Sequence, residues 1–169
     1  MRRALGLTAA MVALLATHGA AAAEESDPSF LALSIGIFDV NDDQTSTEGR
    51  IEYRFGQKFW IFKPMFGLMV NSDGGLYGYG GINFDIYFGE HLVLMPNFAV
   101  GGYRQGDSKN LGSTIEFRSG LELAYRMDDA SRIGIAFHHI SNASIDDNNP
   151  GTEEVVITYS IPIRGLFGR

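Results

Sequence analysis

The sequence contains no cysteine among its 169 residues, so neither a disulfide framework nor thiolate chemistry is available to it. Basic residues are scarce as well: 13 Lys and Arg stand against 20 Asp and Glu, for a formal net charge of −7. A protein that binds nucleic acid needs a basic face, so this balance argues against nucleic acid as a partner. Beyond residue 23 the chain also lacks an apolar run long enough to span a bilayer as a helix.

The first 23 residues have the layout of a secretory signal peptide. Arg2 and Arg3 precede an apolar stretch over 4–15, and a run of alanines over 20–23 supplies the small residues of a cleavage site. A membrane anchor is the weaker interpretation, because the apolar stretch is short. The sequence therefore predicts that 1–23 are removed and that 24–169 fold as a single domain.

The remaining chain combines many glycines with many aromatic residues. The whole sequence holds 21 Gly, 12 Phe, 7 Tyr and 1 Trp. Transmembrane β-barrels hide their apolar surface at alternate positions, carry aromatic girdles and need small residues where the interior is crowded. This composition therefore favours an all-β fold that crosses a membrane with strands.

The period of the sequence supports the same fold. Successive side chains of a strand point to opposite faces, so an apolar face appears as every second residue. Over 111–125 the odd positions are mostly apolar, while the even positions from Glu116 onward include Arg118 and Glu122. The stretches 76–88 and 50–55 show the same alternation.

Eight such segments follow one another, which predicts an eight-stranded antiparallel transmembrane β-barrel. Tight turns are predicted at Gly56-Gln57, Gly89-Glu90 and Asp128-Asp129, and polar loops at 41–46, 71–74, 105–110 and 144–152. Short periplasmic turns and longer external loops are typical of a barrel in the bacterial outer membrane. The predicted segments are 29–40, 47–56, 58–71, 75–88, 91–104, 111–126, 131–143 and 153–163.

The inward positions of these segments carry charges of both signs. Because an eight-stranded barrel is just wide enough for its own side chains, we expect a filled polar core of paired charges and not a pore. The predicted interior residues are Glu52, Arg54, Lys63, Asp85, Asn97, Glu116, Arg118, Glu122 and Arg126, with His138 as a packed histidine.

Three polar residues interrupt the outward rows near one end of the last two segments. The row over 133–137 is apolar and continues as His139 and Ser141, and Glu153 heads the apolar row over 155–161. A serine becomes a good nucleophile when a base accepts its proton, and that base works best when a third group orients it. Ser141, His139 and Glu153 fit these roles, although polar residues at a strand end also occur simply where the membrane gives way to water.

The stretch His139-Ile140-Ser141-Asn142-Ala143, with the later Asn149, Gly151 and Glu153, resembles the lipid A 3-O-deacylases of the PagL type. The resemblance implies an eight-stranded outer-membrane barrel that removes the ester-linked 3-hydroxyacyl chain from position 3 of lipid A, with no metal or cofactor. It implies Ser141 as nucleophile, His139 as base and Glu153 as the orienting acid.

The same resemblance assigns supporting roles to Asn142 and Asn149, with Asn149 as the candidate for stabilising the oxyanion. Ser144 departs from the pattern, which has a glycine there. The implied partners are lipopolysaccharide and the surrounding membrane, and the sequence leaves a homodimer open. The competing hypothesis is a small barrel without enzymatic activity, an adhesin or structural protein whose loops bind a partner.

Overall fold

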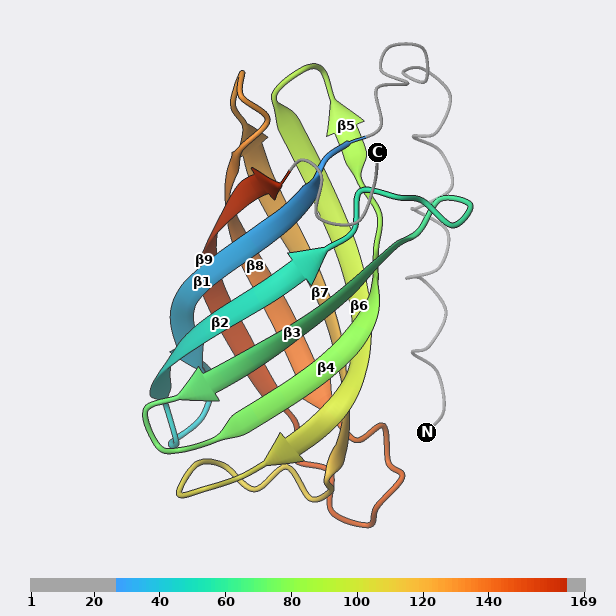
Figure 1. Cartoon of the computed structure of the whole chain (residues 1–169). Helices are drawn as coiled ribbons and strands as arrows, with labels where there is room; N and C mark the ends of the chain where they lie inside the picture. The colour runs from blue at the N-terminus through green and yellow to red at the C-terminus, as the bar shows by residue number, and fades with distance from the viewer. Residues whose placement is uncertain (1–26, 164–169) are drawn as a thin grey trace, which may run out of the picture.

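The computed structural model describes residues 27–163, which form a closed antiparallel β-barrel (Figure 1). Strands that follow one another in the chain pair with each other, except that β4 and β5 both pair with β6, and β1 pairs with β9. No helix among the described residues is long and apolar enough to cross a membrane. The strands are β1 (Ser29–Phe38), β2 (Ser46–Arg54), β3 (Lys63–Asn71), β4 (Leu76–Asn83), β5 (Ile86–Phe88), β6 (Leu92–Arg104), β7 (Ile115–Arg126), β8 (Arg132–Ser141) and β9 (Thr152–Ile163).

The nine segments make eight barrel strands, because β4 and β5 are two parts of one strand. Both pair with β6, and the β4–β6 pairing closes the barrel. Between them the amide of Phe84 still donates to the carbonyl of Pro96, while Asp85 binds Lys63 and Arg132. The prediction of an all-β, eight-stranded antiparallel barrel is confirmed.

The prediction of a tight turn at Gly56 and Gln57 is wrong. β2 ends at Arg54 and β3 begins only at Lys63, so the connection spans 55–62. Within it Phe59 and Phe62 exchange two backbone hydrogen bonds of 2.7 and 3.1 Å and form a small hairpin of their own. The apolar residues over 59–62 therefore form this hairpin and do not lengthen the barrel strand.

The two faces of the wall differ as the alternation predicts. Along β8, for example, Ile133, Ile135 and Phe137 are exposed on the outside, while Ala136 and His138 are buried inside. The same holds along β7, where Glu116, Arg118 and Glu122 are buried and the odd positions point outward. An apolar exterior around a polar interior is the arrangement of a barrel in lipid.

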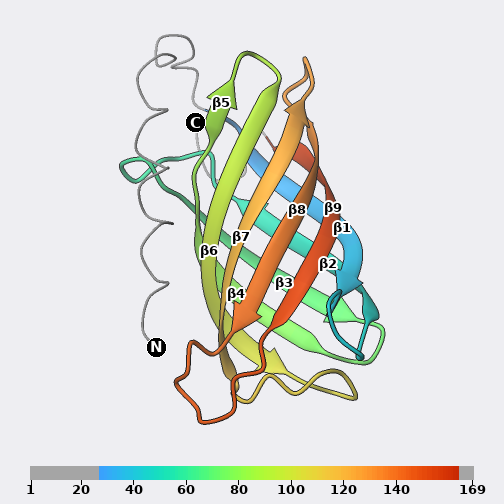
Figure 2. The same cartoon turned by 180° about the vertical axis from the view of Figure 1, so that it is seen from behind.

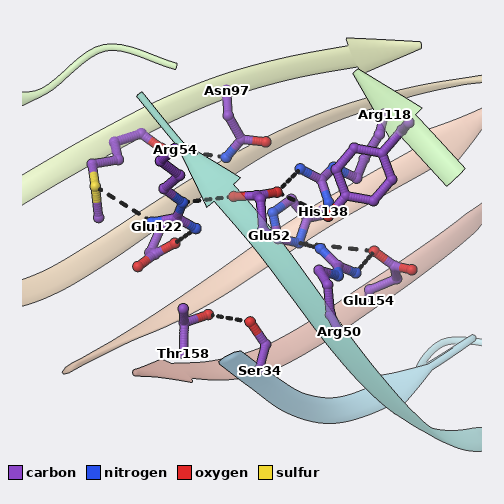
Figure 3. A network of polar contacts seen from close by, with 12 residues as sticks. Ser34, Arg50, Glu52, Arg54, Asn97, Arg118, Glu122, His138, Glu154 and Thr158 are labelled. Atoms are coloured by element: carbon purple, nitrogen blue, oxygen red, sulfur yellow. Dashed lines mark hydrogen bonds and ion pairs between the residues drawn. The ribbon is translucent and has the colours of Figure 1, made fainter. Parts of the chain in front are cut away.

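Paired charges fill the interior (Figure 3). Glu52 binds both Arg54 and Arg118, and Arg54 also binds Glu122 at 2.7 Å. The network continues to residues that the sequence analysis did not single out, since Arg50 binds Glu48 and Glu154 at 2.8 and 2.6 Å. Buried charges are tolerated when they are paired and hydrogen-bonded, so this network is the barrel's core.

The two ends of the barrel differ. The turns from β5 to β6 and from β7 to β8 lie at the end where β1 begins and β9 ends, which we call the turn end (Figure 1). The longest connections, 105–114 and 142–151, lie at the opposite end, the loop end (Figure 2). The predicted signal peptide, 1–23, lies outside the described residues.

Candidate active site

His139 and Glu153 face each other across β8 and β9 on the outer wall near the loop end. The strand register pairs them directly, and the Nδ1 atom of His139 lies 3.0 Å from a carboxylate oxygen of Glu153. Their side chains are 44% and 28% exposed, so the pair is accessible from outside the barrel. A carboxylate that accepts the Nδ1 proton leaves Nε2 as the basic nitrogen of the ring.

Ser141 follows His139 on the same outer row of β8, where the register places it beside Phe117 of β7. Residues i and i+2 of a strand lie about 6–7 Å apart at their Cα atoms. Within residues 27–163 the Ser141 hydroxyl has no hydrogen-bond partner. The contact between Ser141 and His139 therefore stays a prediction, although both residues occupy the predicted face and end.

A second serine lies next to the imidazole. Ser119 of β7 is the direct register partner of His139 and is exposed on the same outer face. Pairing across strands brings side chains closer than the i, i+2 spacing along one strand. Ser119 was not among the predicted site residues, although its odd position in an otherwise apolar outer row was a visible signal.

The chain leaves β8 through a strained turn. Ala143 and Ser144 adopt φ angles of 53° and 61°, in the left-handed region that favours glycine. The amide of Ile145 donates to the carbonyl of Asn142, and the side-chain oxygen of Asn142 accepts the Ser144 amide at 3.0 Å. Ser144 therefore stands at a position where glycine would be unstrained, which is where the sequence departs from the resembled motif.

Asn142 organises this loop from a fully buried position. Its amide nitrogen donates to the carbonyls of Leu111 and Asn148 at 3.1 and 2.7 Å, so both of its protons are engaged. Its backbone amide donates to the side-chain oxygen of Asn149. Asn142 therefore supports the loop, whereas the amide group of Asn149, 3.5 Å from the Ser144 hydroxyl, remains the candidate oxyanion donor.

Gly151 packs directly against the imidazole. A β-carbon at this position would lie 3.0 Å from Cε1 of His139, and the backbone has a φ of 66°. A side chain at 151 would press on the ring and would also strain the backbone. Glycine is therefore required both by the conformation of the loop and by the position of His139.

A buried carboxylate ties the loops to the start of β9. Asp39, completely buried and with a φ of 59°, accepts hydrogen bonds from Lys109 at 2.7 Å and from the Thr152 hydroxyl at 2.9 Å. The adjacent amide of Val40 donates to the carbonyl of Glu153 at 3.1 Å. These contacts, which we call the Asp39 clamp, hold the backbone that carries Glu153.

Lys109 also binds Asp42 at 2.9 Å. Burial of the ammonium acts to lower the pKa of Lys109, but the hydrogen bonds to Asp39 and Asp42 outweigh it, and the pKa lies above its ordinary value. The ammonium of Lys109 therefore stays protonated at neutral pH and keeps its hydrogen bonds to the two carboxylates.

A surface hollow of about 580 Å³ opens at the loop end. Arg104 is the one cationic side chain among the residues that line it, and it is exposed on the outer face at the end of β6. The lining residues are Tyr103, Arg104, Gln105, Asn110, Gly112, Ser113, Thr114, Ile115 and Asp146.

Comparison with solved structures supports the fold. The crystal structure of the outer membrane enzyme PagL matches with a TM-score of 0.62 and 18% identity, covering 79% of this chain and 99% of that one. Neisserial surface protein A matches with a TM-score of 0.53 and 9% identity, covering 80% of this chain and 96% of that chain. At these identities the likeness shows a shared small barrel.

Sequence comparison is more specific. The lipid A deacylase PagL of Bordetella bronchiseptica is 36% identical over 52 residues, 31% of this chain and 29% of that protein. The PagL of Pseudomonas aeruginosa is 34% identical over 65 residues, 38% of this chain and 37% of that protein. The chain therefore aligns with about a third of the length of each relative.

The family model described as lipid A 3-O-deacylase (PagL) matches residues 41–162, which include every barrel strand except β1 and the candidate catalytic residues His139, Ser141 and Glu153. This match confirms the resemblance that the motif around Ser141 suggested. The chain belongs to the lipid A 3-O-deacylase (PagL) family and folds as an eight-stranded antiparallel β-barrel.

Proposed function

We propose that this chain hydrolyses the ester-linked 3-hydroxyacyl chain at position 3 of lipid A, in the outer leaflet, with Ser141, His139 and Glu153 as its catalytic residues. The observation that carries the proposal is the 3.0 Å contact between His139 and Glu153 on the outside of the barrel. A hydrogen-bonded histidine and carboxylate are unusual on a wall that is otherwise apolar, and polar groups exposed toward lipid mark functional sites.

The proposed chemistry uses the three groups in turn. Rotation of the Ser141 side chain brings its hydroxyl toward Nε2 of His139, which accepts the proton as the serine oxygen attacks the ester carbonyl carbon. Glu153 holds the Nδ1 proton and stabilises the charged ring. Nε2 then returns the proton to the sugar oxygen, and the ester bond breaks to leave an acylated Ser141.

Water completes the cycle. His139 takes a proton from the water as its oxygen attacks the acyl carbon, and the proton passes to Ser141 as the free fatty acid leaves. The developing negative oxygen needs a donor in both halves of the reaction, and we assign that role to the amide group of Asn149.

The position of the site suits a lipid substrate. An ester buried in a leaflet can reach residues on the outer wall without entering the barrel, whose interior is filled by charged pairs. The hollow at the loop end, with Arg104 in its lining, offers a cation for the anionic head group of the same molecule.

Mass spectrometry of lipid A from cells with and without this protein tests the proposal. We expect the protein to remove the mass of one hydroxyacyl chain, and Ser141→Ala and His139→Ala to abolish that loss while the barrel still folds, as judged by its heat-modifiable migration on gels. Unchanged lipid A with the folded wild-type protein would contradict the proposal and favour a barrel without enzymatic activity.

Ser119→Ala is the matched control for the nucleophile, because Ser119 lies on the same face and beside the same imidazole. We expect it to retain deacylation within a few-fold of the wild type. Loss of activity in Ser119→Ala with retention in Ser141→Ala would assign the nucleophile to β7 instead.

A further inference from the structure

The connection over 55–62 presents exposed aromatic residues away from the candidate site. Phe59 is 82% exposed and Trp60 is 80% exposed, and Ile61 beside them is also exposed. No other large apolar side chains among the described residues are as exposed as these two. Large aromatic side chains left open in this way mark a surface that meets a partner or a membrane.

The connection is an ordered hairpin with a fixed root. The Phe55 amide donates to the carbonyl of Pro64, and the amide of Gly56 donates to the Ser29 hydroxyl. Trp60 takes a φ of 59° at the turn. The base of the hairpin is therefore held by the strands, while its tip carries the exposed rings.

Ring contacts set the direction of the hairpin. Phe62 packs edge-on against Phe84 of the neighbouring wall at 6.0 Å between ring centroids, and Trp60 packs on Phe62 at 5.8 Å. The hairpin thus leans over the wall and projects sideways from the barrel in both views (Figures 1 and 2). A turn that simply entered the periplasm would point along the barrel axis.

The surface around the hairpin is continuous with the apolar exterior. Phe66 of β3 and Phe88 of β5 are each about half exposed on the adjacent wall. Lys58 directly precedes the two rings, is exposed and has no ionic partner among residues 27–163. Aromatic rings beside a lysine are the combination that occupies the boundary between acyl chains and head groups, where the ammonium meets lipid phosphate.

We propose that the hairpin over 57–62 is a membrane anchor that inserts Phe59, Trp60 and Ile61 into the phospholipid leaflet at the turn end, with Lys58 bound to phospholipid phosphate. The anchor fixes the depth of the barrel from the end opposite the candidate site. It depends on the membrane location of the barrel and not on the proposed catalytic residues.

Trp60 is the single tryptophan of the chain, so its fluorescence reports on this site without any labelling. The experiment uses the folded wild-type protein in vesicles of phosphatidylcholine and phosphatidylglycerol, some with bromine near the head-group end of the acyl chains and others with bromine near the bilayer centre. We expect blue-shifted emission, weak quenching by acrylamide, and several-fold stronger quenching by the shallow bromines than by the deep ones.

Red-shifted emission that acrylamide quenches and bromine does not would overturn the anchor. Emission that responds to the protein-to-lipid ratio and ignores bromine would also overturn it, because the rings would then be covered by a second copy of the chain.

The double substitution Phe59→Ser, Ile61→Ser keeps the reporter and removes its apolar neighbours. We expect several-fold weaker bromine quenching and a red shift, since the hairpin loses its hold on the leaflet. Lys58→Glu should weaken quenching most in vesicles that contain phosphatidylglycerol, whose net negative head group repels the new carboxylate. Quenching equal to that of the wild type in these vesicles would exclude the phosphate contact.

Discussion

Two histidine–glutamate pairs lie one residue apart on β8 and β9, and they face opposite sides of the wall. His139 and Glu153 are paired on the outside, whereas His138 and Glu154 are paired by the same register on the inside. The inner histidine is 3% exposed and its Nδ1 atom lies 3.3 Å from Arg50, which also binds Glu154. The residue types are identical in the two pairs, and only the face of the strand differs.

The surroundings of such a pair decide what it can do. Inside, the carboxylate of Glu154 is engaged by an arginine at 2.6 Å and the imidazole is enclosed, so the pair belongs to a packed network (Figure 3). Outside, Glu153 has no arginine or lysine partner among the described residues and is free to hold the imidazole of His139 alone. A general base needs this freedom and access to substrate.

Replacing each of the two histidines with asparagine should give the largest difference in activity between the outer and the inner pair. We expect His139→Asn to lower the rate of fatty-acid release from lipid A by about a thousandfold or more, as removal of a triad base does. His138→Asn should keep activity within a few-fold, because its side chain does not reach the outer surface. Equal losses in the two variants would mean that the inner pair takes part in the reaction.

Substituting the two glutamates should also give different results. One variant should lose activity and the other should lose stability. Glu153→Gln is expected to reduce kcat by about a hundredfold or more while the barrel unfolds at the same urea concentration, because the imidazole loses the group that orients it. Glu154→Gln should leave most activity and reduce the free energy of unfolding by about 3 kcal/mol, the typical cost of breaking a buried ion pair. A stable, fully active Glu154→Gln together with an unstable Glu153→Gln would reverse the assignment.

Gly151→Ala presses on the outer imidazole and strains the loop backbone, and it leaves the inner pair untouched. The added β-carbon would meet Cε1 of His139 at 3.0 Å, so we expect kcat to fall by about tenfold to a hundredfold through misplacement of the base. Gly89→Ala is the control, since Gly89 has a similar φ of 69° and an added β-carbon there has open space around it. Comparable losses in the two variants would show that the effect is not specific to the imidazole.

Weakening the Asp39 clamp should have the smallest effect. Lys109→Met removes the cation that binds Asp39, and we expect kcat to fall several-fold because the backbone around Glu153 loosens, with recovery in Lys109→Arg. Since the pKa of Lys109 is raised in the fold, the clamp's contribution to stability is present at neutral pH and is lost as the pH rises through that raised pKa. Urea unfolding of both variants at neutral and alkaline pH checks this, and a Lys109→Met variant with unchanged kcat would rule the clamp out as a positioning element.

The alternation of the sequence was sufficient to predict the barrel, its faces and the outward position of His139, Ser141 and Glu153. Each of these follows from the two-residue period of a strand, which is a local property. The connection over 55–62 was not predictable in this way, because its apolar residues alternate like a strand but are paired with one another as a hairpin.

Features that depend on the register between distant segments were also missed. Ser119 becomes a neighbour of His139 only once β7 and β8 are aligned, and Asp39 meets Lys109 and Thr152 only once two loops and the start of β9 come together. The partners of Asn142 were not predictable for the same reason. Its two donors are engaged by Leu111 and Asn148, and that engagement cannot be inferred from the motif.

The most direct measurement identifies the residue that becomes acylated or trapped. The purified barrel in detergent is treated with a long-chain alkyl phosphonate that reacts with activated serines, and the modified residue is mapped by peptide mass spectrometry. The account predicts one adduct on Ser141 that disappears in His139→Asn and persists in His138→Asn. An adduct on Ser119, or labelling of Ser141 that does not depend on His139, would contradict it.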